Sequence, residues 1–146
     1  MTDARALIDR LELIPHPEGG WYRETWRGPG GPSGRAVGTA ILFLLERDQR
    51  SHWHRVDAHE LWLWQMGDPL SLHIAATEAD RAVPLVLGPN SEEGQQFQAV
   101  VQAGHWQAAI PANQGSGFGF TLVSCVVTPG FEFAGFELAP PGWEPG

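Results

Sequence analysis

The most concentrated set of side chains that could do chemistry lies in residues 51–60, SHWHRVDAHE, which hold three of the six histidines. Side chains of an extended chain alternate between its two faces, so His52 and His54 are expected on the same face. Glu60 follows a turn expected at residues 56–58 and begins the next predicted strand. Two imidazoles and one carboxylate are therefore expected to converge from neighbouring strands.

Such a set of two histidines and one carboxylate leaves open coordination positions around a metal ion. It suits Fe(II), Mn(II), Ni(II) or Zn(II), so one divalent transition metal is a candidate cofactor. A hydrogen-bonded polar face that holds no metal is the alternative interpretation of the same residues.

Short strands must position these residues, because β-type runs recur from residue 21 to the end and no long helical pattern intervenes. The expected strands are residues 21–26, 37–45, 51–55, 60–66, 70–75, 82–87, 97–101, 105–110, 118–127 and 131–137. A short helix is expected over residues 2–13, with Thr2 or Asp3 as N-cap, and residues 15–20 should break any regular element. The pattern predicts one all-β domain over residues 1–146, an antiparallel sandwich or barrel.

The composition excludes several functions. All nine cationic residues are arginines, so a lysine Schiff base or a Walker lysine is impossible. A net charge of −8 argues against nucleic acid as a partner. The longest apolar runs are far shorter than the ~20 residues that span a bilayer, and no secretory signal is apparent, so a cytoplasmic protein that binds no membrane is expected. Cys125 is expected to be a buried, inert thiol.

The spacing around residues 51–67 resembles the first cupin signature, G-x5-H-x-H-x(3,4)-E-x6-G. His52 and His54 match its two histidines, and Gly67 follows Glu60 at the expected interval. The interval between His54 and Glu60 is one residue longer than in the signature, and Glu46 stands at the upstream glycine.

The chain more specifically resembles the fifth cupin family, a group of small single-domain cupins of uncharacterised function. The blocks that carry this resemblance are HPEGGWYRET (16–25), SHWHR (51–55) with ELW (60–62), and PGFEFAGFELA (129–139). His59 stands where that family usually has an acid, and it is a second candidate ligand. The resemblance implies a double-stranded β-helix, or jelly-roll barrel, with a short N-terminal helix, a site inside the barrel and a homodimer.

The second cupin signature, which supplies the fourth metal ligand in metal-dependent cupins, is poorly kept. Gly104 is present, but Gln107 stands at the histidine position. A glutamine oxygen is a weaker ligand than imidazole for these metals, and His105 is the alternative. The expected metal ligands are His52, His54, Glu60 and Gln107.

The chain also resembles the nucleotide-sugar epimerases of the cupin superfamily in the residue types of its candidate site. Those enzymes work without a metal, and they have a histidine base, a tyrosine acid and arginines that hold the phosphates. By this analogy His54 or His52 removes a proton, Tyr22 returns one, and Arg23 or Arg55 binds an anionic group. The other expected ligand-binding residues are Glu24, Trp62, Trp64 and Gln107.

Three functions therefore fit the sequence. The first is an isomerase or epimerase that acts on a small polar, sugar-like metabolite in the barrel. The second is a mononuclear metal-dependent cupin, either an oxygenase or an isomerase. The third is a module that binds a small ligand without changing it.

Overall fold

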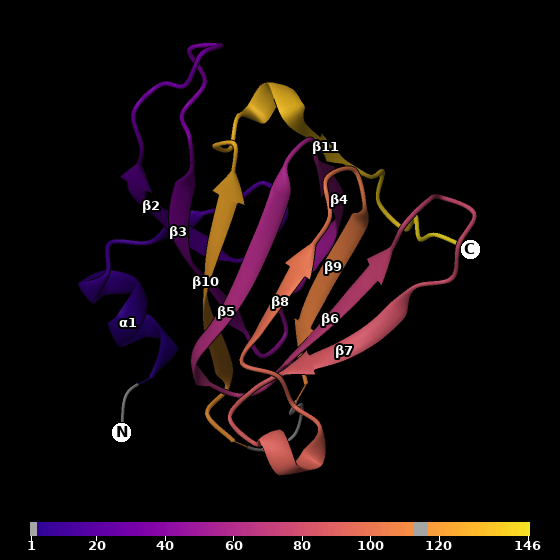
Figure 1. Cartoon of the computed structure of the whole chain (residues 1–146). Coiled ribbons are helices and arrows are strands. Elements are labelled where there is room, and N and C mark those ends of the chain that lie inside the picture. Colours follow the sequence, from indigo (N-terminus) through magenta and orange to yellow (C-terminus); the bar gives the residue numbers. More distant parts are fainter. Residues whose placement is uncertain (1–2, 113–116) are drawn as a thin grey trace.

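Two antiparallel sheets packed face to face form most of the protein, of which the computed structural model describes residues 3–112 and 117–146 (Figure 1). The six-stranded sheet has the order β1 (Ile14–Pro15), β2 (Trp21–Arg27), β3 (Thr39–Glu46), β10 (Phe120–Thr128), β5 (His59–Gly67) and β8 (Gln98–Val101). The five-stranded sheet has the order β11 (Phe136–Leu138), β4 (Ser51–Val56), β9 (Trp106–Pro111), β6 (Leu70–Ala75) and β7 (Val83–Leu87). The predicted all-β jelly-roll class is confirmed.

Two local predictions need correction. The run 131–137 was expected as one strand, but a 3-10 turn, η2 (Phe133–Gly135), precedes β11, because the Gly135 amide donates to the Glu132 carbonyl. Residues 15–20 were expected to lack regular structure, yet Pro15 ends β1, which pairs with β2. Pro15 is tolerated there because β1 is an edge strand and needs fewer N–H donors.

The N-terminal helix, α1 (Ala4–Arg10), covers the outer face of the six-stranded sheet. Asp3 is its N-cap and accepts a 2.8 Å hydrogen bond from the Ala6 amide, whereas Thr2 lies outside the described residues. Leu7 and Ile8 are buried against Leu44 and other residues of the sheet. No helix in the described part of the chain is long and apolar enough to cross a membrane.

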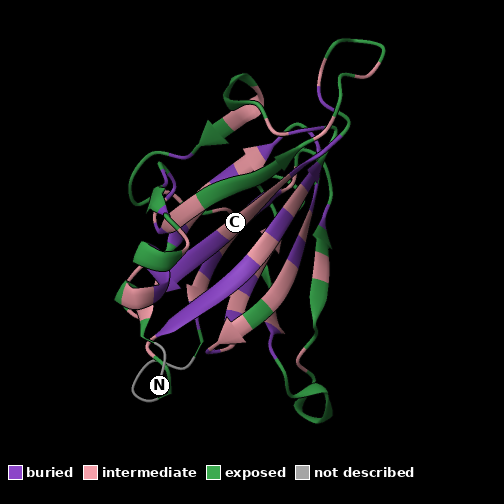
Figure 2. Cartoon of the chain, turned by 90° about the vertical axis from the view of Figure 1, so that its left-hand side faces the viewer, coloured by how far each residue is buried: buried purple, intermediate pink, exposed green. Residues whose placement is uncertain are grey.

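The core lies between the two sheets, where Phe43 and Leu45 of β3 pack with Trp62 of β5 and Leu72 of β6. Leu44, between the two β3 residues, points the other way and packs under α1. Both faces of β3 are therefore covered, which explains its continuous apolar run. Figure 2 shows burial over the described part of the chain, with most buried positions on strands and many exposed positions in the connections.

Candidate active site

A cavity of about 370 Å³ lies between the two sheets. Tyr22, Ile41, Glu60 and Cys125 line it from the six-stranded sheet, and His54 lines it from the five-stranded sheet. Its volume falls in the range of small-molecule sites, and its wall is largely apolar with a few polar groups.

Glu18 enters this cavity from the turn between β1 and β2. The turn lies so close to the chain at Arg50 that a Cβ on Gly19 would overlap the Arg50 carbonyl oxygen, and Gly19 has a φ of +109°. Glycine tolerates both conditions. The Glu18 carbonyl accepts a 2.8 Å bond from the His52 amide, and its carboxylate accepts a hydrogen bond from the Ser51 hydroxyl.

A β-bulge in β4 separates the two histidines that were expected to share a face. Between Ser51 and His54, β4 advances three residues while its partner β9 advances two, so the strict alternation of side chains is lost. His54 is 1% exposed and lines the cavity. His52 lies outside the cavity lining, and its Nε2 is 2.9 Å from the Pro140 carbonyl oxygen.

The hydrogen bonds of His54 define its tautomer. Its Nδ1 lies 2.7 Å from the His52 carbonyl oxygen, which can only accept, so Nδ1 carries the proton. Nε2 therefore presents a lone pair and lies 3.5 Å from Oε2 of Glu18. Burial lowers the pKa of His54, although the nearby Glu60 carboxylate acts in the opposite direction. His54 is thus a neutral base at neutral pH.

The two buried carboxyl groups have strongly shifted acidities. Burial raises the pKa of Glu18 to about 8, against the opposing effect of the Ser51 hydrogen bond. Burial raises the pKa of Glu60 to about 7, with Glu18 adding to the shift and His54 opposing it. At neutral pH Glu18 is mostly protonated and Glu60 is close to its titration midpoint, so Glu18 and His54 form a neutral pair and not an ion pair.

His16 also lines the cavity and, with Glu18, His54 and Glu60, forms its polar group. Like Glu18, His16 is not among the site residues predicted from the sequence. Its Nδ1 accepts a 3.1 Å bond from the Glu18 amide and lies 3.3 Å from Oε1 of Glu18. Burial lowers the pKa of His16 to about 4, and His54 contributes to the shift, so the ring is neutral. Both residues belong to the block HPEGGWYRET of the family resemblance, which was the available signal.

Gln107 is fixed by two side chains and does not present its oxygen to the cavity. The Trp62 indole donates a 2.7 Å bond to Oε1 of Gln107, and Nε2 of Gln107 donates a 2.9 Å bond to Glu60. An indole N–H can only donate, so this orientation of the amide is the only one that satisfies both partners. The amide oxygen is therefore already engaged.

These contacts decide how far the predicted metal ligands fit a metal ion. Of the four, His54 and Glu60 face the cavity, whereas His52 points to Pro140 and Gln107 offers an NH₂ group. Within residues 3–112 and 117–146, no group of three or more histidine, cysteine, aspartate or glutamate side chains is arranged to hold a metal ion. The arrangement does not fit the predicted four-ligand site.

The predicted ligand-binding residues are divided between the cavity and the surface. Tyr22 and Glu24 line the cavity. Arg23 donates to the Leu11 carbonyl at 3.3 Å and is exposed. Arg55 bonds to Glu137 at 2.9 Å and stacks over Trp106 at 4.7 Å. Neither arginine lines the cavity.

The predicted tryptophans lie in the core and do not line the cavity. Trp62 is 1% exposed, and Trp64 packs against the same core while its indole donates to the Asp68 carbonyl at 3.0 Å. His59, the second candidate ligand, is exposed, and its Nδ1 accepts a bond from the Ala103 amide.

The segment after β10 forms the rim of the cavity with three phenylalanines. The ring centroids of Phe131 and Phe133 are 4.9 Å apart, and those of Phe133 and Phe136 are 6.0 Å apart, with nearly perpendicular planes in both pairs. The His54 ring lies 5.5 Å from Phe136. The aromatic rim therefore reaches down to the polar group.

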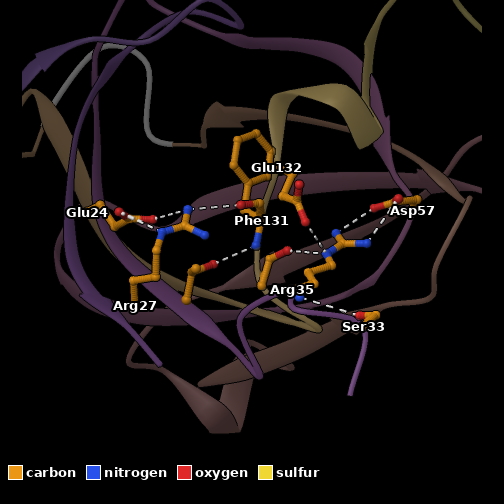
Figure 3. A network of polar contacts seen from close by, with 9 residues as sticks. Glu24, Arg27, Ser33, Arg35, Asp57, Phe131 and Glu132 are labelled. Atoms are coloured by element: carbon orange, nitrogen blue, oxygen red, sulfur yellow. Dashed lines mark hydrogen bonds and ion pairs between the residues drawn. The ribbon is translucent and has the colours of Figure 1, made fainter. Parts of the chain in front are cut away.

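Two arginines tie this rim to the rest of the barrel (Figure 3). Arg27 donates to Glu24 at 2.7 Å and to the Phe131 carbonyl at 2.9 Å. Arg35 makes two bonds to Asp57, at 2.7 and 3.1 Å, and a third to the Gly130 carbonyl. Both guanidinium groups are thus occupied by protein acceptors.

Facing antiparallel sheets that enclose histidine and carboxyl side chains define a cupin barrel. The family model Cupin_5, described as cupin superfamily (DUF985), matches residues 5–139, and the chain belongs to this family. No curated protein matched in the corresponding comparison.

Solved structures agree with this assignment. A protein from Shewanella oneidensis is 34% identical with a TM-score of 0.86, over 95% of this chain and 85% of that chain. A hypothetical protein from Leishmania major is 31% identical with a TM-score of 0.85, over 97% of this chain and 90% of that one. Oxalate decarboxylase from Bacillus subtilis, studied for its Mn(II) centres, is 13% identical with a TM-score of 0.56, over 81% of this chain and 28% of that one. This last likeness shows the fold alone.

Proposed function

We propose that the protein is an enzyme that isomerises or epimerises a small polar, sugar-like metabolite by proton transfer in the cavity. The observation that carries the proposal is the unprotonated Nε2 of buried His54, which lies beside the buried carboxyl group of Glu18. A neutral imidazole and a protonated carboxyl group in one cavity supply a base and an acid at neutral pH.

In this mechanism Nε2 of His54 takes a proton from a carbon next to the substrate carbonyl. The electron pair of the C–H bond moves to the carbonyl oxygen, which takes a proton from Glu18. The oxygen then returns its proton to Glu18 while the carbon takes a proton back, either from His54 on the same face or from Tyr22 on the other face. In the second case His54 releases its extra proton to solvent and Tyr22 takes one up, which restores both groups. Glu60 also faces the cavity, where it accepts a hydrogen bond from the Gln107 amide and lies beside the Cys125 thiol. Atoms balance, since one proton leaves carbon and one returns.

The distribution of cations favours an uncharged or cationic substrate over a phosphorylated one. Arg27 is the cation among the described residues that line the cavity, and Glu24 already pairs with it. Arg23 and Arg55, expected to hold an anionic group, lie elsewhere.

Solvent-deuterium exchange tests this proposal. Neutral and amino aldoses and ketoses would be incubated with the protein in D₂O, and loss of the C–H signal next to the carbonyl followed by proton NMR. We expect the exchange to fall at least about 100-fold in His54→Gln, as for loss of a general base. His105→Gln, outside the cavity lining, is the matched control. An unchanged rate in His54→Gln would refute the proposal.

The mononuclear metal centre predicted from the sequence is the second candidate, because two of its predicted ligands, His54 and Glu60, face the same cavity. A divalent Fe, Mn, Ni or Zn ion would polarise a substrate oxygen as a Lewis acid. Elemental analysis of protein purified without chelator decides between the candidates: a stoichiometric metal that His54→Ala releases would replace the proposal above. A ligand recovered unchanged after long incubation would instead favour the binding module.

The homodimer implied by the family resemblance is also a proposal. Exposed apolar side chains lie on β1 and β2 at one end of the six-stranded sheet, where Ile14 is 55% and Trp26 is 48% exposed. Light scattering would give twice the chain mass of 16.0 kDa. A monomer mass at micromolar concentration would exclude it.

A further inference from the structure

The carboxyl groups of the cavity outnumber its cations. The charged side chains in its lining are Glu18, Glu24, Glu60, Glu132 and Arg27. Glu24 pairs with Arg27 at 2.7 Å, and Glu132 lies 3.3 Å from Arg35. The negative charges of these two carboxylates are therefore balanced by the two arginines. Glu18 and Glu60 contact hydroxyl, amide, thiol and imidazole groups only. The cavity therefore holds two buried carboxyl groups that no arginine within residues 3–112 and 117–146 neutralises.

Aromatic rings line the same cavity as these carboxyl groups. Phe131, Phe133 and Phe136 are mutually within 6.0 Å, at interplanar angles of 82°, 68° and 82°. The His16 ring contacts Tyr22 at 4.5 Å and Phe136 at 6.1 Å. Rings set at steep angles to one another present faces in several directions, as in the aromatic cages that hold organic cations.

We infer that the cavity binds a small metabolite that carries a protonated amine, with the ammonium group at Glu60, the adjoining carbons against the phenylalanine rings, and Glu18 left protonated as the acid of the proposed reaction. An ammonium group supplies the countercharge that a buried carboxylate needs, and ring faces add cation–π attraction. An anionic ligand would face the same carboxyl groups without a free arginine. A neutral polyol would satisfy hydrogen bonds but leave the charge uncompensated.

The acidities agree with this assignment. Burial without a cation raises the pKa of Glu60 to about 7 and of Glu18 to about 8. A bound ammonium group would favour the ionised carboxylate. The inference rests on the proposed function in taking this cavity as the ligand site and sharpens it by naming the substrate class, an amine-bearing polar metabolite.

Matched pairs of probes test the inference with the full chain. Glucosamine against glucose, and cyclohexylamine against cyclohexanol, would be titrated at millimolar concentration by ligand-observed NMR. We expect at least one amine to bind about tenfold more tightly than its alcohol. Glu60→Gln should lose this preference, whereas Glu93→Gln, an exposed position on η1 (Ser91–Glu93), should keep it.

A second pair of variants separates cation–π attraction from simple burial. Phe136→Leu keeps an apolar side chain in the rim but removes its ring, so amine affinity should fall severalfold while alcohol affinity changes little. Phe118→Leu, an exposed phenylalanine outside the lining, should change neither. The Phe136→Leu comparison carries the test should Glu60→Gln not fold, as judged by circular dichroism.

Three results would overturn the inference: no amine binds, every alcohol binds as well as its amine, or the preference persists in Glu60→Gln. The binding test is independent of turnover. Amine binding without deuterium exchange would contradict only the proposed reaction, whereas exchange on neutral sugars alone would contradict only the substrate class.

Discussion

Glu18 and His54 meet in the cavity with Oε2 of the acid 3.5 Å from Nε2 of the imidazole. Glu18 comes from the turn before β2 and His54 from β4 of the opposite sheet, so the contact links the two halves of the barrel. Because burial raises the pKa of Glu18 and lowers that of His54, both partners are neutral at neutral pH. The contact therefore places a neutral base next to a neutral acid.

Stability should depend on pH through these acids. The folded state holds a proton on Glu18 up to a pKa of about 8, whereas the unfolded chain loses it near 4.5. The folded state thus binds more protons in this interval, so the free energy of unfolding falls as pH rises. His16, with its pKa lowered from 6.5 to about 4, acts in the opposite direction below pH 6.5.

Glu60, whose pKa burial raises to about 7, acts in the same direction as Glu18, so between pH 6.5 and 8 we expect a loss of about 2 kcal/mol, measured by urea denaturation. Glu18→Gln mimics the protonated acid and should remove most of this slope, while Glu93→Gln should keep it. A wild-type stability that rises over this interval would contradict the assigned acidities.

Gly19 should be needed for the position of Glu18. A Cβ there would overlap the Arg50 carbonyl, so Gly19→Ala must shift the turn and should cost about 2–3 kcal/mol. Gly34→Ala is the matched control, because Gly34 also has a positive φ (+86°) but nothing within 4 Å of the added Cβ. It should cost only about 1 kcal/mol. Equal losses by thermal denaturation would show that the close approach to Arg50 is not a constraint.

Strand alternation was enough to predict most of the fold. Residues 40–45 are apolar at both alternating sets of positions, which is typical of a strand covered on both faces, and α1 and the barrel interior do cover β3. The predicted turns and the family resemblance together predicted a jelly-roll fold, and this prediction is confirmed. Alternation also placed Glu60 on the inner face of β5, together with Trp62.

The rest of the site depends on features that alternation does not contain. A β-bulge between Ser51 and His54 turns His52 away from His54, and a bulge leaves no mark in the pattern of residue types. Glu18 and His16 come from the segment 15–20, which contains two prolines and two glycines and has no periodicity that predicts the direction of a side chain. Their proximity to His54 is a long-range contact of the folded chain.

Gln107 should stabilise the barrel by satisfying partners on both of its sides. Gln107→Leu leaves the Trp62 indole N–H without its acceptor and Glu60 without its amide donor, both in a buried setting. The expected cost is about 2–4 kcal/mol by urea denaturation. Gln65→Leu, which removes an exposed bond to Ser124, should stay within about 0.5 kcal/mol. A loss in Gln107→Leu no larger than in Gln65→Leu would contradict the paired hydrogen bonds.

Arg35 should hold the rim of the cavity in place. Its guanidinium group binds Asp57 through two bonds and the Gly130 carbonyl through a third, and a lysine ammonium group lacks this forked geometry. Asp57 is about half exposed, so solvent screens the pair and the stability loss in Arg35→Lys should be only about 1 kcal/mol.

Hydrogen exchange at the rim is a more sensitive measurement of Arg35→Lys than overall stability. The Phe131 amide donates to Thr39 at 2.9 Å, and its hydrogen exchange should accelerate severalfold once Gly130 loses its guanidinium partner. Arg10→Lys, on the surface of α1, is the matched control and should leave this amide unchanged. Amine affinity should fall in Arg35→Lys, since the ring of Phe131 belongs to the same segment. Equal exchange at Phe131 in both variants would mean that β10 and the 3-10 turn η2 position the rim without Arg35.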